Sequence, residues 1–314
     1  MVAGKGDNGE AQVVITKQFS LEAWVNYLDH AQLPVLRRTL AELGPLKERE
    51  DELNGRELAA VILHDPIMTV KVLRTLEARR SKSQITDITT IDRAIMMMGT
   101  TPFFNQFSRQ PLIEDTLADY PRALEGMMWG MSRARHAALY ALDWAALRHD
   151  ISTDEVVVAA LLRDMAEILL WCYAPEPMLA IREKMHHDPT LRSATAQQEV
   201  LGFRLIELQL KLASAWHLPK LLLSLMDEAH ADMPRTKCVK LAVALARHSA
   251  NGWSDAALPD DFAAIHDFLK IPPDEAWERT RHMALLAAKG WDWYGVPPAA
   301  TWLPMQAGLM TEKP

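Results

Sequence analysis

Histidine followed by aspartate is the pairing in this sequence whose chemistry could hold a metal ion. Imidazole nitrogens and carboxylate oxygens bind divalent cations, and the bound cation lowers the pKa of a water molecule enough to make it a nucleophile. The pairing occurs at residues 64–65, 149–150, 187–188 and 266–267. The first and third precede prolines, the second falls in a predicted loop, and the fourth lies on a predicted surface helix. A metal site needs ligands that converge from several helices, so we expect none of the four to be one.

A charged doublet inside the most apolar stretch is the stronger candidate. Residues 156–171 read VVVAALLRDMAEILLW, and a helix of this composition would be apolar around most of its circumference and therefore buried. Arg163 and Asp164 stand side by side at its centre, and charges are rarely buried without a partner. The pattern predicts one helix that starts at a Thr153 cap and ends before Pro175. The doublet is either a reaction centre or the remnant of one.

Other catalytic chemistries find little support. Ser132 has no histidine at a spacing that would make it a nucleophile, and the chain contains neither a GxGxxG motif nor a Walker loop. The two cysteines, Cys172 and Cys238, lie in apolar helical contexts without zinc-ligand spacing. We expect both to be reduced thiols of the core, in a reducing compartment.

Composition narrows the class of protein. The chain has 314 residues, of which 49% are hydrophobic, which suits a globular protein of about two domains. A net charge of −7 argues against nucleic-acid and membrane-surface partners. The first residues lack the apolar core of a signal peptide, and no run reaches the roughly 20 apolar residues of a membrane span. We therefore expect a cytoplasmic protein.

Capping residues, glycines and prolines predict an all-α chain with two helical lobes. We expect a flexible tail at 1–18, a first lobe at 19–120, a second at 121–290 and an arm rich in proline and tryptophan at 291–314. The methionine run 96–98 is expected to fill the core. Helices are expected at 21–33, 34–43, 54–63, 66–79, 88–99, 101–107, 121–148, 153–171, 178–187, 195–216, 219–230, 236–250 and 274–289.

A series of short motifs runs through both lobes. In the first lobe they are Pro34, the ILHDP of 62–66, the VLR of 72–74 and the ITTIDRAIMMMG of 88–99. In the second they are Trp129, Ser132, the ALLRD of 160–164, Glu199, Leu201–Gly202 and the WHLP of 216–219. Together they resemble the HDOD domain, the HD-related output domain of bacterial signalling proteins, over about residues 20–250. The resemblance implies an HD-like fold for the second lobe.

The resemblance also implies where a metal would sit in enzymatic relatives, which use a first histidine, a His-Asp doublet and a later aspartate. Here Met131 stands at the first position and Arg163–Asp164 at the doublet, while 239–246 contains no carboxylate for the last. Arg163 would bring a fixed positive charge to the place of a divalent cation. The resemblance therefore predicts a degenerate metal site, with neither metal nor another cofactor bound.

Neighbouring side chains are expected to support this degenerate site. A carboxylate at 164 without a metal needs a cation, and the candidates are Arg163, Arg133 and Arg135. His136 is expected to be a hydrogen-bonded histidine of the core, and His230 to be the remnant of a histidine pair of related domains.

These expectations favour a non-catalytic regulatory module for signal transduction. It would act by binding an unidentified signalling protein, or a small ligand, in a helical groove, with neither nucleic acid nor membrane as partner. Whether it forms a homodimer stays open. The alternative is a metal-dependent HD-type phosphohydrolase with a non-standard site, and a nucleic-acid-associated regulator is disfavoured by the charge of −7.

Overall fold

The structure, a computed structural model, describes residues 19–79, 88–188, 190–227 and 232–304. Within these ranges the regular structure is helical, apart from one isolated β-bridge between Val35 and Leu112. The prediction of an all-α fold is confirmed. The predicted tail at 1–18 lies outside the described residues.

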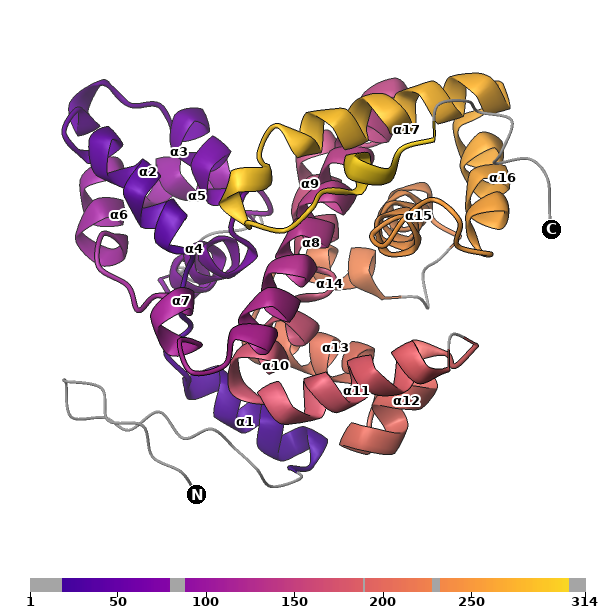
Figure 1. Cartoon of the computed structure of the whole chain (residues 1–314). Helices are drawn as coiled ribbons and strands as arrows, with labels where there is room; N and C mark the ends of the chain where they lie inside the picture. Colours follow the sequence, from indigo (N-terminus) through magenta and orange to yellow (C-terminus); the bar gives the residue numbers. More distant parts are fainter. Residues whose placement is uncertain (1–18, 80–87, 189, 228–231, 305–314) are drawn as a thin grey trace.

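The described helices follow one another in two groups (Figure 1). The first is α1 (Leu21–His30), α2 (Arg37–Lys47), α3 (Gly55–Ile62), α4 (Pro66–Ala78), α5 (Ile91–Met98), α6 (Thr100–Phe107) and α7 (Ile113–Thr116). The second is α8 (Pro121–Leu147), α9 (Thr153–Leu162), α10 (Met165–Tyr173), α11 (Pro175–His187), α12 (Ser193–Leu201), α13 (Leu205–Ala215), α14 (Lys220–Met226), α15 (Pro234–His248), α16 (Leu258–Leu269) and α17 (Pro273–Ala288). Short 3₁₀ helices are η1 (Glu50–Glu52), η3 (Trp291–Trp293) and η4 (Ala299–Trp302).

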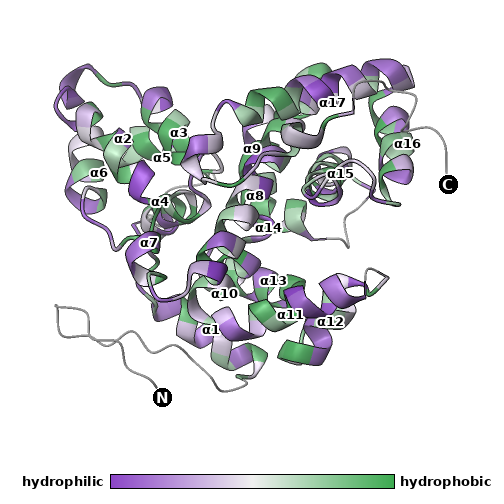
Figure 2. Cartoon of the chain, viewed as in Figure 1, coloured by the Kyte–Doolittle hydropathy of each residue, from purple (hydrophilic) through white to green (hydrophobic). Residues whose placement is uncertain are grey.

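Helix α8 is the axis of the molecule, and α9, α10, α15 and α17 pack along it. Helices α2 to α6 form a separate lobe to one side of α8 (Figure 1). Figure 2 shows hydrophobic and hydrophilic residues mixed within most helices, as expected for helices that bury one face and expose the other. Helix α1 was predicted to belong to the first lobe, but it packs on α13 of the second group. Its Tyr27 ring lies edge-to-face against Tyr173 of α10, with a centroid distance of 5.6 Å.

The apolar stretch 156–171 is buried as predicted, but it is two helices rather than one. Helix α9 ends at Leu162, a turn follows at Arg163 and Asp164, and α10 begins at Met165. Both residues of the turn are half-buried, whereas the apolar residues on either side of it are buried. The break therefore brings two charges toward the surface from within a segment that is otherwise core.

Gln209 of α13 holds this break. Its side-chain oxygen accepts a hydrogen bond from the Ala166 amide at 2.8 Å, and its side-chain nitrogen donates to the Leu162 carbonyl at 2.8 Å. In a continuous helix that amide would donate to that carbonyl, because the two residues are four apart. The inserted amide group satisfies both backbone groups in the core, where Gln209 itself is buried.

The predicted boundaries of the second helix are wrong at both ends. Helix α2 begins at Arg37 because Val35 is extended, with its amide donating to the Pro111 carbonyl at 2.9 Å. The buried carboxylate of Asp65 accepts from the Leu36 amide at 2.8 Å, directly before the helix. Helix α2 also continues past Pro45 to Lys47, although the proline has no N–H to donate to the Ala41 carbonyl one turn earlier.

Two boundaries in the second group also differ from the prediction. The helix expected over 195–216 is divided into α12 and α13, because Gly202 takes a left-handed conformation with φ 82°. Pro175 was expected to follow the end of the helix that starts at Thr153, but it is the first residue of α11. The N–H that proline lacks would have no partner in the first turn of a helix.

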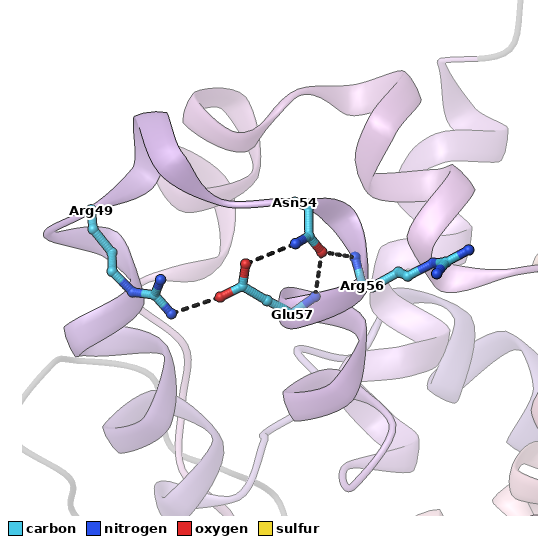
Figure 3. Close-up of polar contacts among 4 residues, drawn as sticks. All are labelled: Arg49, Asn54, Arg56 and Glu57. Atoms are coloured by element: carbon cyan, nitrogen blue, oxygen red, sulfur yellow. Dashed lines mark hydrogen bonds and ion pairs between the residues drawn. The ribbon is translucent and has the colours of Figure 1, made fainter.

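Asn54 caps the start of α3 (Figure 3). Asn54 Oδ1 accepts from the amides of Arg56 and Glu57 at 3.0 Å each, and Asn54 Nδ2 donates to Glu57 Oε1 at 2.8 Å. Arg49 completes the arrangement by donating to Glu57 Oε2 at 2.7 Å. These local contacts fix the start of α3 as a sequence pattern would predict.

The expectation that methionines 96–98 of α5 fill the core is wrong for two of the three. Met98 is buried, but Met96 and Met97 are 73% and 61% exposed. Helix α5 lies on the surface of its lobe and turns only one face toward α3 and α4. Three consecutive residues of one helix point in three directions, so a run of this length cannot all be core there.

The segment that follows α17 crosses between the two lobes. Tyr294 Oη donates to the His64 carbonyl at 2.8 Å, and Trp293 stacks on the His64 ring with centroids 4.3 Å apart. Farther along, Trp302 stacks over Trp129 of α8 with centroids 6.2 Å apart. We call residues 291–304 the C-terminal arm; it includes η3 and η4.

Cys172 and Cys238 are buried free thiols, and burial raises the pKa of each to about 12. They are therefore protonated and unreactive at neutral pH. None of the described helices combines the length and the apolar composition needed to cross a membrane.

Candidate functional site

Besides Arg163, four charged side chains gather at the turn between α9 and α10. Arg133 of α8 donates from Nη2 to Oε1 of Glu167 in α10 at 2.6 Å. Arg247, in the last turn of α15, places Nη2 3.8 Å from Oδ2 of Asp164 in the turn. We call these residues the charge cluster; it joins three helices and the break that Gln209 holds.

The charge cluster is compensated internally. The side chains of Arg133, Asp164 and Glu167 are 20%, 20% and 22% exposed, so all three are largely withdrawn from water. Burial by itself would lower the pKa of Arg133, but the carboxylates of Glu167 and Asp164 outweigh it and raise that pKa above its usual value. Two guanidinium groups face two carboxylates, which satisfies the rule that buried charges are paired.

The cation beside Asp164 is only partly as predicted. Arg133 acts on Asp164 electrostatically, yet its close hydrogen bond goes to Glu167. Arg135 points elsewhere and donates to the Leu63 carbonyl of the first lobe at 3.4 Å. Asp164 instead forms an ion pair with Arg247, which was not among the cations predicted from the sequence.

Met131 and His136 both lie on the buried side of α8. Met131 is fully buried. His136 donates from Nδ1 to the Ser132 carbonyl at 2.8 Å; the direction follows because a carbonyl can only accept. His136 is therefore a hydrogen-bonded histidine of the core, as expected. Burial lowers the pKa of His136, which keeps the ring neutral at pH 7. Its Nε2 is buried without a hydrogen-bond partner among the described residues.

A small cavity adjoins both His136 and the charge cluster. It has a volume of about 10 Å³ and is lined by α8 (Trp129, Ser132, Arg133 and His136), by α15 (Ala246 and Ala250) and by the C-terminal arm (Pro297 and Ala299). The arm is anchored here by Trp253, whose Nε1 donates to the Ala299 carbonyl at 2.9 Å. A space of this size holds about one water molecule.

The remaining predicted residues that the structure describes contribute no ligand set. His230 lies outside the described residues. Each His-Asp pair has a local structural role: Asp65 caps α4, Asp150 binds Arg148, Asp188 binds Thr190, and His266 bonds to the Ile271 carbonyl. Burial lowers the pKa of His64 to about 4.

The donor set at the charge cluster does not fit a divalent cation. Such an ion needs several neutral or anionic donors converging on one point. Among the residues that the structure describes, no group of three or more histidine, cysteine, aspartate or glutamate side chains is placed to share an ion. The two guanidinium groups of the cluster carry only donors and would repel a cation.

Two members of the charge cluster, Glu167 and Arg247, were not predicted from the sequence as site residues. Glu167 was visible as the third charge of the apolar stretch, three residues after Asp164. Arg247 carried no such signal, because it ends a helix more than 80 positions away along the chain and its place beside Asp164 depends on how α15 packs.

Comparison with known proteins identifies the family of this chain and solved structures with a similar fold. The HDOD domain matches residues 33–232, and a search of curated proteins found no significant match. The structure resembles the MmoQ response regulator of Methylococcus capsulatus, at 19% identity and a TM-score of 0.60, covering 79% of this chain and 98% of that one. It also resembles a virulence factor of Campylobacter jejuni, at 16% identity and a TM-score of 0.63, covering 85% of this chain and 96% of that one. At these identities the two structures show a shared fold, while the family match spans more than half of the sequence: the chain belongs to the HDOD domain family.

Proposed function

We propose that this chain is a non-catalytic regulatory module of signal transduction, which acts by binding a signalling protein partner. The observation that carries the proposal is the charge cluster. Its two carboxylates, Asp164 and Glu167, are held by the guanidinium groups of Arg247 and Arg133. In this proposal, the doublet that the family resemblance implies as a former metal site serves instead as a structural junction between helices.

Electrostatics supports this reading over hydrolysis. Arginine stays protonated at every physiological pH, so the positive charge of the cluster cannot be titrated away to admit a metal ion. Displacing Arg133 from Glu167 would also leave a largely buried guanidinium without its partner, which costs several kcal/mol. A divalent cation would have to overcome both the repulsion by the guanidinium groups and the cost of displacing Arg133 from Glu167.

The C-terminal arm supports it as well. Pro297 and Ala299 line the cavity beside Arg133, and its volume of about 10 Å³ has no room for a phosphate ester. Trp302 over Trp129 and the hydrogen bond from Trp253 hold the arm in this place. A module that binds its partner at its surface does not need a larger cavity here, whereas a hydrolase would need one to admit its substrate.

The decisive experiment measures metal content and phosphoester hydrolysis on the same protein. The purified chain is incubated with Mn²⁺, desalted and assayed for bound manganese and for turnover of p-nitrophenyl phosphate and bis-(p-nitrophenyl) phosphate. Asp164→Asn is the test variant, and Asp119→Asn, which changes an exposed aspartate, is the matched control. We expect less than a tenth of an equivalent of manganese and equal background rates in all three proteins.

One equivalent of manganese in the unmodified chain, with turnover that disappears in Asp164→Asn and persists in Asp119→Asn, would overturn the proposal. It would establish instead the metal-dependent phosphohydrolase that the sequence analysis kept as its alternative.

A further inference from the structure

A second cavity among the described residues lies away from the charge cluster, where the segment after α1 meets α4 and the α6–α7 connection. It has a volume of about 340 Å³, at the lower end of the range of small-molecule sites. Lys71 and Arg74 of α4, Arg109 and Gln110 of the connection, and the segment 31–33 line it. None of the described lining residues is acidic, and three are cationic.

The cavity lies on the seam between the two lobes. Its wall at Gln32 receives a hydrogen bond from Tyr173 Oη of α10, which donates to the Gln32 carbonyl at 2.8 Å. Its wall at Arg74 stacks on the Trp216 ring at the end of α13, 4.8 Å from the centroid. A ligand in the cavity would therefore touch elements tied directly to the second lobe.

The three cations are presented differently. Arg74 is fixed by stacking and by hydrogen bonds from Nη2 to the Asp29 carbonyl at 2.8 Å and to its carboxylate at 3.3 Å. Lys71 donates one proton to the Leu33 carbonyl at 2.5 Å, which leaves two N–H groups for a further acceptor. Arg109 is exposed at the rim, with no ion pair to a described carboxylate.

The protonation of Lys71 is poised near neutrality. Burial lowers the pKa of its ammonium group to about 8, the nearby Asp65 carboxylate opposes that change, and the charge of Arg74 adds to it. Arg109 lines the same cavity, and Asp29 lies behind Arg74. A bound anion would stabilise the ammonium form and would lose affinity as the pH rises through 8.

We infer that this cavity is a binding site for a small phosphorylated metabolite. A phosphate monoester carries up to two negative charges and several acceptor oxygens, which match a lysine with two unused donors beside two forked guanidinium groups. The polar, basic walls disfavour an apolar ligand, and the volume suits a compact one. As the input of a regulatory module this assignment rests on the proposed function, but binding itself is measured independently of it.

The test uses ribose 5-phosphate, inorganic pyrophosphate and unphosphorylated ribose as probes, in isothermal titration calorimetry of the full chain at pH 7. We expect the two phosphorylated probes to bind and ribose not to bind. Lys71→Met and Arg109→Gln should each weaken the binding at least tenfold. Arg56→Gln, which changes an arginine outside the cavity, is the matched control and should leave affinity unchanged. Raising the pH to 9 should weaken the binding to the unmodified chain.

Arg109→Gln keeps the test decisive if Lys71→Met fails to fold, because Arg109 is exposed and has no ion pair to a described carboxylate. The inference is overturned if neither phosphorylated probe binds, or if both bind equally well to Arg109→Gln and Arg56→Gln. These outcomes do not depend on the manganese assay. A chain without metal chemistry can fail here, and a chain that binds phosphate can still prove to be a hydrolase.

Discussion

Replacing Gln209 by leucine tests the break between α9 and α10. Leucine keeps the volume and burial of the side chain but removes the group that serves the Ala166 amide and the Leu162 carbonyl, each at 2.8 Å. An unsatisfied buried polar group costs about 1–3 kcal/mol. Two such groups, partly offset by the more apolar side chain, should reduce the free energy of unfolding by about 3 kcal/mol.

Urea denaturation followed by circular dichroism measures this loss. With a slope of about 3 kcal/mol per molar urea, the midpoint should fall by about 1 M. Gln198→Leu is the matched control, because that amide donates to the Gly202 carbonyl at an exposed helix end, and its midpoint should change by less than about 0.3 M. If Gln209→Leu lowers the midpoint no more than Gln198→Leu, the amide does not hold the break, and the two backbone groups satisfy each other instead.

Three further predictions concern α8, α15 and the C-terminal arm. Gly126→Ala should destabilise the fold by about 1–3 kcal/mol, because an added Cβ would lie 2.7 Å from the Trp171 ring, whereas Gly130→Ala in the same helix meets its nearest side-chain atom at 3.4 Å and should be tolerated in the same urea assay. The pKa of His248 is raised chiefly by its hydrogen bond to an aspartate of α16, so its contribution to stability is complete below the unfolded pKa of about 6.5 and is lost as the pH rises through the higher folded pKa. The stability difference between the unmodified chain and His248→Asn should thus be larger at pH 5.5 than at pH 8.5, and a difference that grows with pH would contradict the assignment. Trp293→Ala removes the ring stacked on the first lobe and should speed limited proteolysis within the arm, with an unchanged cleavage pattern as the contrary result.

Most helix types and many helix starts follow from local signals. Ser20, Asn54 and Asp65 each cap the helix expected after them, with side-chain acceptors in place. These contacts join residues two or three apart, so short patterns contain the information needed to predict them. The burial of the stretch 156–171 likewise follows from its composition.

Tertiary contacts decided the boundaries that were predicted wrongly. Helix α2 starts late because Val35 pairs with the segment around Pro111, and the amide of Leu36 is taken by Asp65. The break after Leu162 depends on Gln209, which is remote in sequence. Each involves a backbone group whose partner comes from a distant element, and no local pattern can name that partner.

The candidate site divides in the same way. The sequence by itself determined that Asp164 sits in a buried segment and needs a cation, because an unpaired charge cannot stay there. Only the tertiary structure decided which cations approach it. The packing of α15 on α8 and α9 brings Arg247 to Asp164, and the Arg133 side chain turns to Glu167 rather than to the doublet. Composition sets the requirement for a partner, whereas the partner's identity depends on the relative positions of helices that are far apart in the chain.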